Sequence, residues 1–159
     1  MMLAGPFEAA AALLPAAGIA KLAPARSTTG TVAPRRLLGS AEVAIGAYAV
    51  LAGDRIGAVA VALAYIAFAG VVLARWARSG PEASCECFGA RPSRATPMHA
   101  VVDVAGALVA SIAAFDPPGS LVHVLSRQPM AGGPFLVASA TVAYLAYMLL
   151  TARRPAVHQ

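Results

Sequence analysis

Charged residues are scarce in this 159-residue chain and make up only 12% of it. A soluble domain usually carries about 25% charged residues. Hydrophobic residues account for 59% of the chain, and the mean hydropathy is +0.72. This composition argues against an ordinary soluble domain and indicates a small integral membrane protein.

Cysteine is rarer still, because Cys85 and Cys87 are the only two in the chain. Two cysteines are too few for the disulfide scaffold of a small secreted domain. Acidic residues are also few, seven against twelve basic ones, which gives a net charge of +5. The basic residues stand between apolar blocks and form no continuous stripe, so we expect contact with anionic lipid headgroups and no nucleic acid partner.

Five apolar blocks predict an all-α fold, a polytopic membrane bundle of about five transmembrane helices. The expected helices cover about residues 3–23, 37–53, 56–76, 97–115 and 134–151 of a single domain over residues 1–159, with polar loops at about 24–36 and 77–96. We expect the first block to be retained and not cleaved as a signal peptide. Nothing basic precedes it, Glu8 lies inside it, and Pro15 interrupts it.

The basic residues also predict an orientation. Ten of the twelve fall in the two polar loops and the tail, or at the block ends beside them, and only Arg55 and Arg127 fall on the other side. The positive-inside rule then predicts an external N-terminus, and a cytoplasmic C-terminus and cysteine loop, in a bacterial-type plasma (inner) membrane. Stable disulfides are least expected on the cytoplasmic side, where thiols are kept reduced.

Four ionisable residues are expected at the bundle end that carries the cysteines: Lys21, Glu42, His99 and Asp103. With five spans, the loops after the first and third helices lie on the same side. A charge at the bilayer centre costs about 3 kcal/mol, so such residues face the bundle interior and usually have partners. Depth suggests Lys21 as the partner of Glu42. Two roles stay open for this pair, fixing the first helix against the second or handling protons.

The cysteine spacing favours redox chemistry. Cys85 and Cys87 can close a small, strained disulfide ring, and strain makes a disulfide labile and suited to exchange. Arg91 and Arg94 favour the thiolate, whereas Glu86 opposes it. Two other interpretations stay open: incidental loop cysteines, or a Cu(I) or Zn(II) site in which both sulfurs bind with Met98 or His99.

His99 and Asp103 are spaced i, i+4 and therefore share one face of their helix. An imidazole oriented in this way could act as a base for a nearby thiol. The alternative is a histidine at the start of a helix, exposed to water among the headgroups.

Four segments then resemble the MauE branch of the MauE/DoxX membrane proteins: "AAGIAKL", "GSAEVAIGAYAVL", "CECFG" and "HAVVDVAGALVAS". The resemblance covers about Leu13 to Ser111. It implies a four-helix core followed by a C-terminal helix. It also implies Cys85 and Cys87 as the redox pair, with Lys21 and Glu42 as the signature of the first two helices.

The same resemblance implies thiol–disulfide exchange with a thioredoxin-like protein or a membrane quinone, in support of the maturation of partner proteins. This is the leading functional hypothesis, and it makes the chain a candidate thiol–disulfide oxidoreductase. The alternative from another class is a non-catalytic accessory subunit of a larger membrane complex. The sequence assigns no bound cofactor beyond the quinone that the resemblance suggests.

Overall fold

The computed structural model describes residues 4–23, 32–80, 84–85, 93–94, 97–122, 137, 140–145 and 148. Its elements are α1 (Ala4–Leu22), α2 (Val32–Ala52), α3 (Arg55–Ser79), β1 (Ser84–Cys85), β2 (Ser93–Arg94) and α4 (Pro97–Phe115). The described residues from 137 to 148 are also helical. The predicted all-α bundle is confirmed, and the two short strands form only a two-residue ladder.

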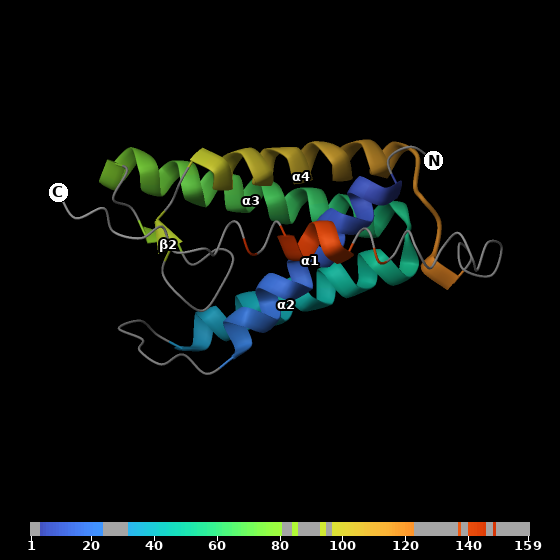
Figure 1. The fold of residues 1–159 in the computed structure, drawn as a ribbon, viewed down its shortest axis with the longest axis horizontal. Helices are drawn as coiled ribbons and strands as arrows, with labels where there is room; N and C mark the ends of the chain where they lie inside the picture. Colours follow the sequence, from blue (N-terminus) through green and yellow to red (C-terminus); the bar gives the residue numbers. More distant parts are fainter. Residues whose placement is uncertain are drawn as a thin grey trace.

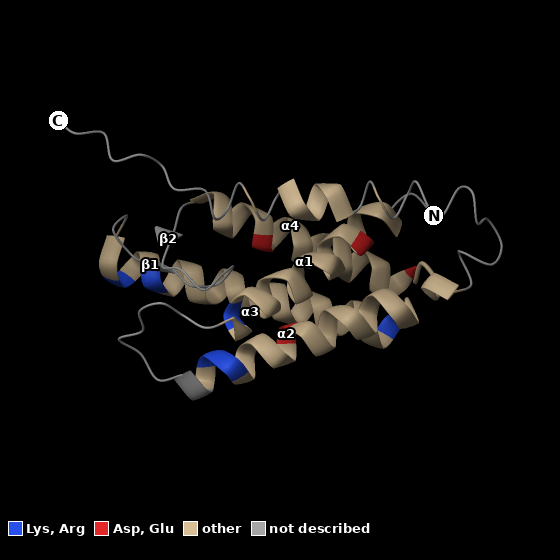
Figure 2. Ribbon diagram, turned by 60° about the horizontal axis from the view of Figure 1, so that its bottom comes forward, with Lys and Arg blue, Asp and Glu red and all other residues tan. Residues whose placement is uncertain are grey.

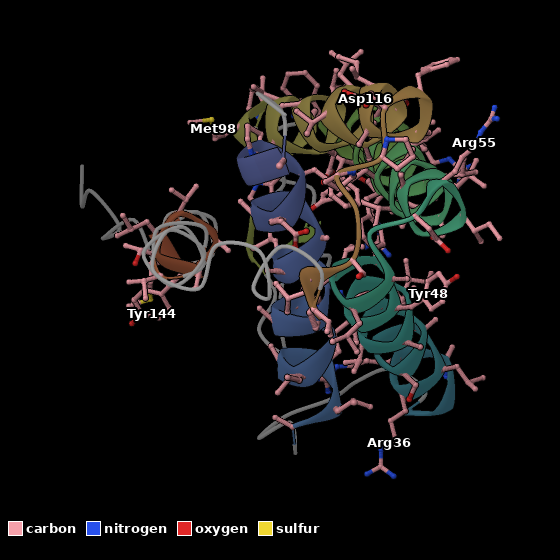
Figure 3. The ribbon with its side chains drawn as sticks, turned by 90° about the vertical axis from the view of Figure 1, so that its right-hand side faces the viewer. Arg36, Tyr48, Arg55, Met98, Asp116 and Tyr144 are labelled. Atoms are coloured by element: carbon pink, nitrogen blue, oxygen red, sulfur yellow. The ribbon has the colours of Figure 1, made fainter. Side chains whose placement is uncertain are left out.

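The helices pack as two antiparallel pairs. α3 and α4 lie side by side along the length of the molecule, and α1 packs mainly on α2 and crosses beneath the α3–α4 pair (Figure 1). The described C-terminal helical residues lie beside α1, where Ala143 joins a small apolar cluster with Leu13, Ala17 and Val72 (Figures 1 and 3). One end of the bundle therefore holds the ends of α1 and α3 and the starts of α2 and α4.

Some helix bounds differ from those predicted. α2 begins at Val32, so the part of the predicted loop from residue 32 to residue 36 is helical. Pro34 is tolerated there because it stands in the first turn, where its missing N–H is not needed. α3 continues past Trp76 to Ser79 because Ala77 and Arg78 are good helix formers, and it ends at Gly80 with a φ of 61°. α4 has the predicted bounds.

Small side chains fill most of the interior, and many large apolar ones face outward. The buried core consists mostly of alanines, such as Ala49, Ala58 and Ala110. Leu63 and Leu108 are each about 60% exposed. A soluble protein buries such side chains, whereas in lipid small residues let helices approach closely and large ones contact the acyl chains.

Two helices among the described residues, α3 and α4, are long and apolar enough to cross a bilayer. α1 and α2 carry ionisable side chains on their buried faces. Their buried ionisable side chains include Lys21 and Glu42, which turn toward each other inside the bundle. Buried ionisable groups that face the bundle and find partners are compatible with a position inside a membrane.

Glycines set the close approach of α1 and α2. A Cβ atom at Gly18 would lie 2.5 Å from the Gly39 carbonyl oxygen, and one at Gly46 would lie 2.6 Å from the Ala11 carbonyl oxygen and overlap Cδ of Pro15. Only hydrogen fits at these crossings. The close contact brings the last turn of α1 against the second and third turns of α2.

The opposite end of the bundle is fastened by a capped turn. The Asp54 side chain accepts hydrogen bonds from the Gly57 N–H at 2.8 Å and from the Tyr48 hydroxyl at 2.7 Å. These two hydrogen bonds, the backbone one first, hold the pKa of the Asp54 carboxyl below its ordinary value. The Gly119 N–H donates to the Gly53 carbonyl oxygen at 3.1 Å, which ties the segment after α4 to this turn.

Candidate functional site

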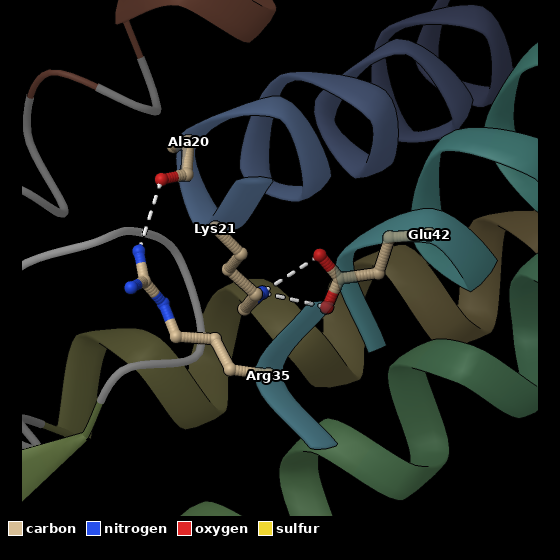
Figure 4. A network of polar contacts seen from close by, with 4 residues as sticks. All are labelled: Ala20, Lys21, Arg35 and Glu42. Atoms are coloured by element: carbon tan, nitrogen blue, oxygen red, sulfur yellow. Dashed lines mark hydrogen bonds and ion pairs between the residues drawn. The ribbon is translucent and has the colours of Figure 1, made fainter. Parts of the chain in front are cut away.

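A buried ion pair joins α1 to α2. Lys21 Nζ lies 2.6 Å from Glu42 Oε1 and 2.7 Å from Oε2, and both side chains are 2% exposed (Figure 4). The ammonium also lies 5.5 Å from the centre of the Phe68 ring on α3. The two hydrogen bonds to the carboxylate and the contact with the aromatic face offset the desolvation cost of burying this ammonium.

The pair forms because of where each residue stands in its helix. Lys21 lies in the last turn of α1, where a cation also interacts favourably with the helix dipole. Next to it, Arg35 of α2 donates to the Ala20 carbonyl oxygen at 3.3 Å (Figure 4). The partner that depth suggested for Glu42 is thus the one observed.

His99 and Asp103 lie one turn apart on the buried face of α4. His99 is 3% exposed and Asp103 is fully buried. The alternative of a histidine in headgroup water is therefore wrong, because the bundle itself covers the imidazole. Asp103 lies near enough to the Lys21 ammonium to be attracted by it, so residues from three helices converge here.

Asp103 differs from Glu42 in its hydrogen bonding. Neither of its carboxylate oxygens has a hydrogen-bond partner in the part of the chain that the structure describes. Buried polar atoms are hydrogen-bonded in the great majority of cases, so an exception needs an explanation.

Tyr65 is a residue whose role the sequence analysis did not identify. The Tyr65 side chain is buried, and its hydroxyl donates to the Ala10 carbonyl oxygen at 2.8 Å. Its ring lies against Gly106 and meets the Phe68 ring edge-on at 6.3 Å. Tyr65 thereby connects α1, α3 and α4 beside the buried polar cluster of Lys21, Glu42, His99 and Asp103. The residues that flank Tyr65 in the sequence are apolar and do not indicate this connection.

Glu8 is a third buried acid, which entered the sequence analysis only as an argument against a cleaved signal peptide. It lies in the first turns of α1, toward the other end of the bundle, and is 7% exposed. One carboxylate oxygen, Oε2, has no hydrogen-bond partner among the described residues.

The cysteine segment begins with a short hairpin between α3 and α4. In β1 and β2, Ser84 pairs with Arg94 and Cys85 pairs with Ser93 in antiparallel register. β1 contacts α3, and β2 ends just before α4 begins at Pro97. The backbone of Cys85 therefore lies at the bundle end where α4 presents His99. Cys87 lies outside the described residues.

Basic residues gather at this same end (Figure 2). Described members are Lys21 at the end of α1, Arg35 and Arg36 at the start of α2, and Arg75 and Arg78 at the end of α3. Arg55, at the start of α3, lies at the opposite end. The described helices thus carry the charge asymmetry that the sequence pattern indicated.

The soft-metal alternative concerned Cys85, Cys87 and His99. Within the described ranges, no three residues of the types His, Cys, Asp and Glu lie close enough together to hold a metal ion.

Comparison with known protein families now bears on this arrangement. Residues 8–116 match the family described as "Methylamine utilisation protein MauE", which is about two thirds of the chain. The chain belongs to the MauE family. The resemblance seen in the sequence motifs is therefore confirmed, and the protein is a membrane protein of this family. No curated protein and no solved structure matched the chain.

The match to the MauE family extends from α1 through α4 and includes the cysteine hairpin. All six residues that the sequence singled out lie inside it: Lys21, Glu42, Cys85, Cys87, His99 and Asp103. The C-terminal helical residues lie beyond it and add to a four-helix core.

Proposed function

We propose that this MauE protein is a membrane thiol–disulfide exchange protein, with Cys85 and Cys87 as its redox pair. The observation that carries the proposal is the pairing of Cys85 with Ser93. This pairing puts the Cys85 backbone beside β2, which ends just before α4 begins, at the end of the bundle that holds Lys21, Glu42, His99 and Asp103.

The chemistry is an exchange of two electrons and two protons. One thiolate of the pair attacks a partner disulfide, so that a mixed disulfide forms and one partner sulfur leaves as a thiolate. The second thiolate then attacks the mixed disulfide, which closes the Cys85–Cys87 disulfide and releases the partner as a dithiol. The reverse sequence returns the pair to the reduced state.

The surroundings favour this chemistry over an inert pair of cysteines. A thiolate is the reactive species, and cationic surroundings stabilise it. The basic residues at this bundle end supply such surroundings, and the sequence places Arg91 and Arg94 close to the pair. In this proposal His99 accepts the proton of the attacking thiol, and Asp103 lies one turn further into the bundle.

We infer that the partner is a thioredoxin-like protein, or a protein that matures through disulfide bonds. The family description names methylamine utilisation, which supports a client matured for that use. Because the basic end is assigned to the cytoplasm by the positive-inside rule, the thioredoxin-like donor is the partner that fits best on that side.

Single cysteine variants test the proposal in cells. Cys85→Ser and Cys87→Ser each remove one thiol, so the variant that keeps the attacking cysteine cannot resolve the mixed disulfide and accumulates it. We expect a reducible adduct with the partner in one single variant and none in the double variant. The readout is non-reducing electrophoresis after acid quenching, followed by identification of the captured protein.

A matched control is Ser84→Ala, which changes the neighbouring β1 residue and leaves both thiols in place. Absence of an adduct in both single variants, with the partner's redox state unchanged, would contradict the proposal. A stable stoichiometric partner that co-purifies equally with all variants would instead indicate the accessory-subunit role.

A further inference from the structure

Asp103 is a buried acid that is not part of the Lys21–Glu42 ion pair. It is fully buried, and both of its oxygens are without a hydrogen-bond partner in the described portion of the chain. A carboxylate in this position would be strongly disfavoured by desolvation unless a positive charge or a proton balanced it.

The groups near Asp103 come from all four helices. Lys21 of α1 and Tyr65 of α3 lie close enough to interact with it electrostatically, and Glu42 of α2 joins them through its ion pair with Lys21. His99 precedes Asp103 by one turn on α4 itself. The Tyr65 hydroxyl donates to the Ala10 carbonyl oxygen, and Lys21 Nζ donates to both oxygens of Glu42. Arg35 acts on Lys21 from the outer side of the pair.

The charges of this cluster do not balance when all of its groups are ionised. One ammonium, that of Lys21, faces two carboxyl groups, those of Glu42 and Asp103. Interior charges without compensation are costly, and a single added proton makes the cluster neutral. The two carboxyl groups compete for that proton, because the ammonium can neutralise only one of them.

We propose that Lys21, Glu42 and Asp103 form a buried proton-binding site that holds one exchangeable proton. The ligand is the proton itself, and Asp103 is the group that carries it while Lys21 is bound to Glu42. A movement of the ammonium toward Asp103 would transfer the proton to Glu42, so the site has two arrangements of equal charge.

Such a site suits the exchange chemistry, and this use of it rests on the proposed function. The attacking thiol must lose a proton, and the leaving partner thiolate must gain one. His99 lies one turn closer than Asp103 to the start of α4, where the cysteine hairpin ends. Asp103 would accept the proton through His99 and return it by the same route.

Infrared spectroscopy of the full chain in lipid vesicles tests the site without relying on thiol chemistry. The host is the Cys85→Ser/Cys87→Ser protein, so failure of the exchange proposal leaves this result intact. We expect the carbonyl band of a buried protonated carboxylic acid, which is lost in Asp103→Asn and shifted in Asp103→Glu. Asp116→Asn, at an exposed position beyond the same helix, is the matched control and keeps the band.

The band must also respond to pH and to the ion pair. The band should decrease as the pH is raised, because the proton is then released, and Glu42→Gln should move that titration. The proposal would be overturned if the Asp103 variants lost no band at any pH. It would also be overturned if the band did not change with pH. A carboxylate that stays ionised and responds only to sodium would show that a metal cation, not a proton, balances the charge. Retention of helical circular dichroism in both Asp103 variants shows that the comparison is made between folded proteins.

Discussion

At the scale of single residues, the interior of this protein is defined by a few polar side chains in an apolar bundle. Lys21 Nζ donates to both carboxylate oxygens of Glu42 at 2.6 and 2.7 Å, and this contact joins the last turn of α1 to α2. Removing one partner of a buried ion pair leaves an uncompensated charge, whereas replacing both with apolar residues is often neutral.

Lys21→Met should therefore lower the free energy of unfolding in detergent micelles by about 3 kcal/mol, because Glu42 loses the ammonium that compensates it. The double variant Lys21→Met/Glu42→Leu should recover most of this loss. Arg36→Met, which removes an exposed cation near the same bundle end, is the control and should change little. Equal losses in the Lys21 variant and the control would refute a structural role for the pair.

Much of this residue-scale picture could be predicted from the sequence. Depth within each helix placed Lys21, Glu42, His99 and Asp103 at one bundle end, because helix length and span order fix depth. The burial of Tyr65 could not be predicted in the same way. It depends on which face of α3 meets Gly106 of α4, and a helix that is apolar all round carries no such information.

At the scale of elements, the α1–α2 contact depends on glycine. Gly46 faces the turn of α1 that contains Pro15, and a methyl group added at Gly46 would lie only 2.6 Å from the Ala11 carbonyl oxygen. Pro15 lacks the N–H that would otherwise bond to that oxygen. Such a methyl group would push the helices apart and disturb the Lys21–Glu42 contact.

Gly46→Ala should accordingly lower the unfolding free energy by about 1–3 kcal/mol through overpacking. Gly70→Ala is the matched control, because nothing lies within 4 Å of its added methyl. That control should be neutral or slightly stabilising, since alanine favours the helix. Thermal or denaturant unfolding measures both variants. Equal changes in unfolding free energy would refute the claim that Gly46 is needed for the close contact of α1 and α2.

The bounds of the helices show which sequence signals are enough to predict where a helix begins and ends. Pro97 marks the start of α4, and the apolar run that follows ends at Phe115, so both bounds could be predicted. The start of α2 could not, because Val32–Arg36 is polar enough to resemble a loop. In the fold, Arg35 of this turn donates to the Ala20 carbonyl oxygen at the end of α1, a tertiary contact that local sequence does not reveal.

At the scale of the whole molecule, small residues inside and large apolar ones outside make a bundle that fits lipid, with its basic residues at the end where Cys85 lies. The family match covers the four helices and the cysteine hairpin together. One end of the bundle therefore holds both Cys85, a member of the proposed redox pair, and the proposed proton-binding site.

The central claim is that Cys85 and Cys87 interconvert as a pair between dithiol and disulfide. The most direct measurement is a redox titration in inside-out membrane vesicles, with glutathione buffers of graded potential and a membrane-impermeant thiol reagent. We expect two reactive thiols to disappear together in one two-electron step, with a tenfold change in ratio over about 30 mV, and neither thiol to react in right-side-out vesicles. Two thiols that are lost independently, or that stay reduced at every potential, would contradict the account.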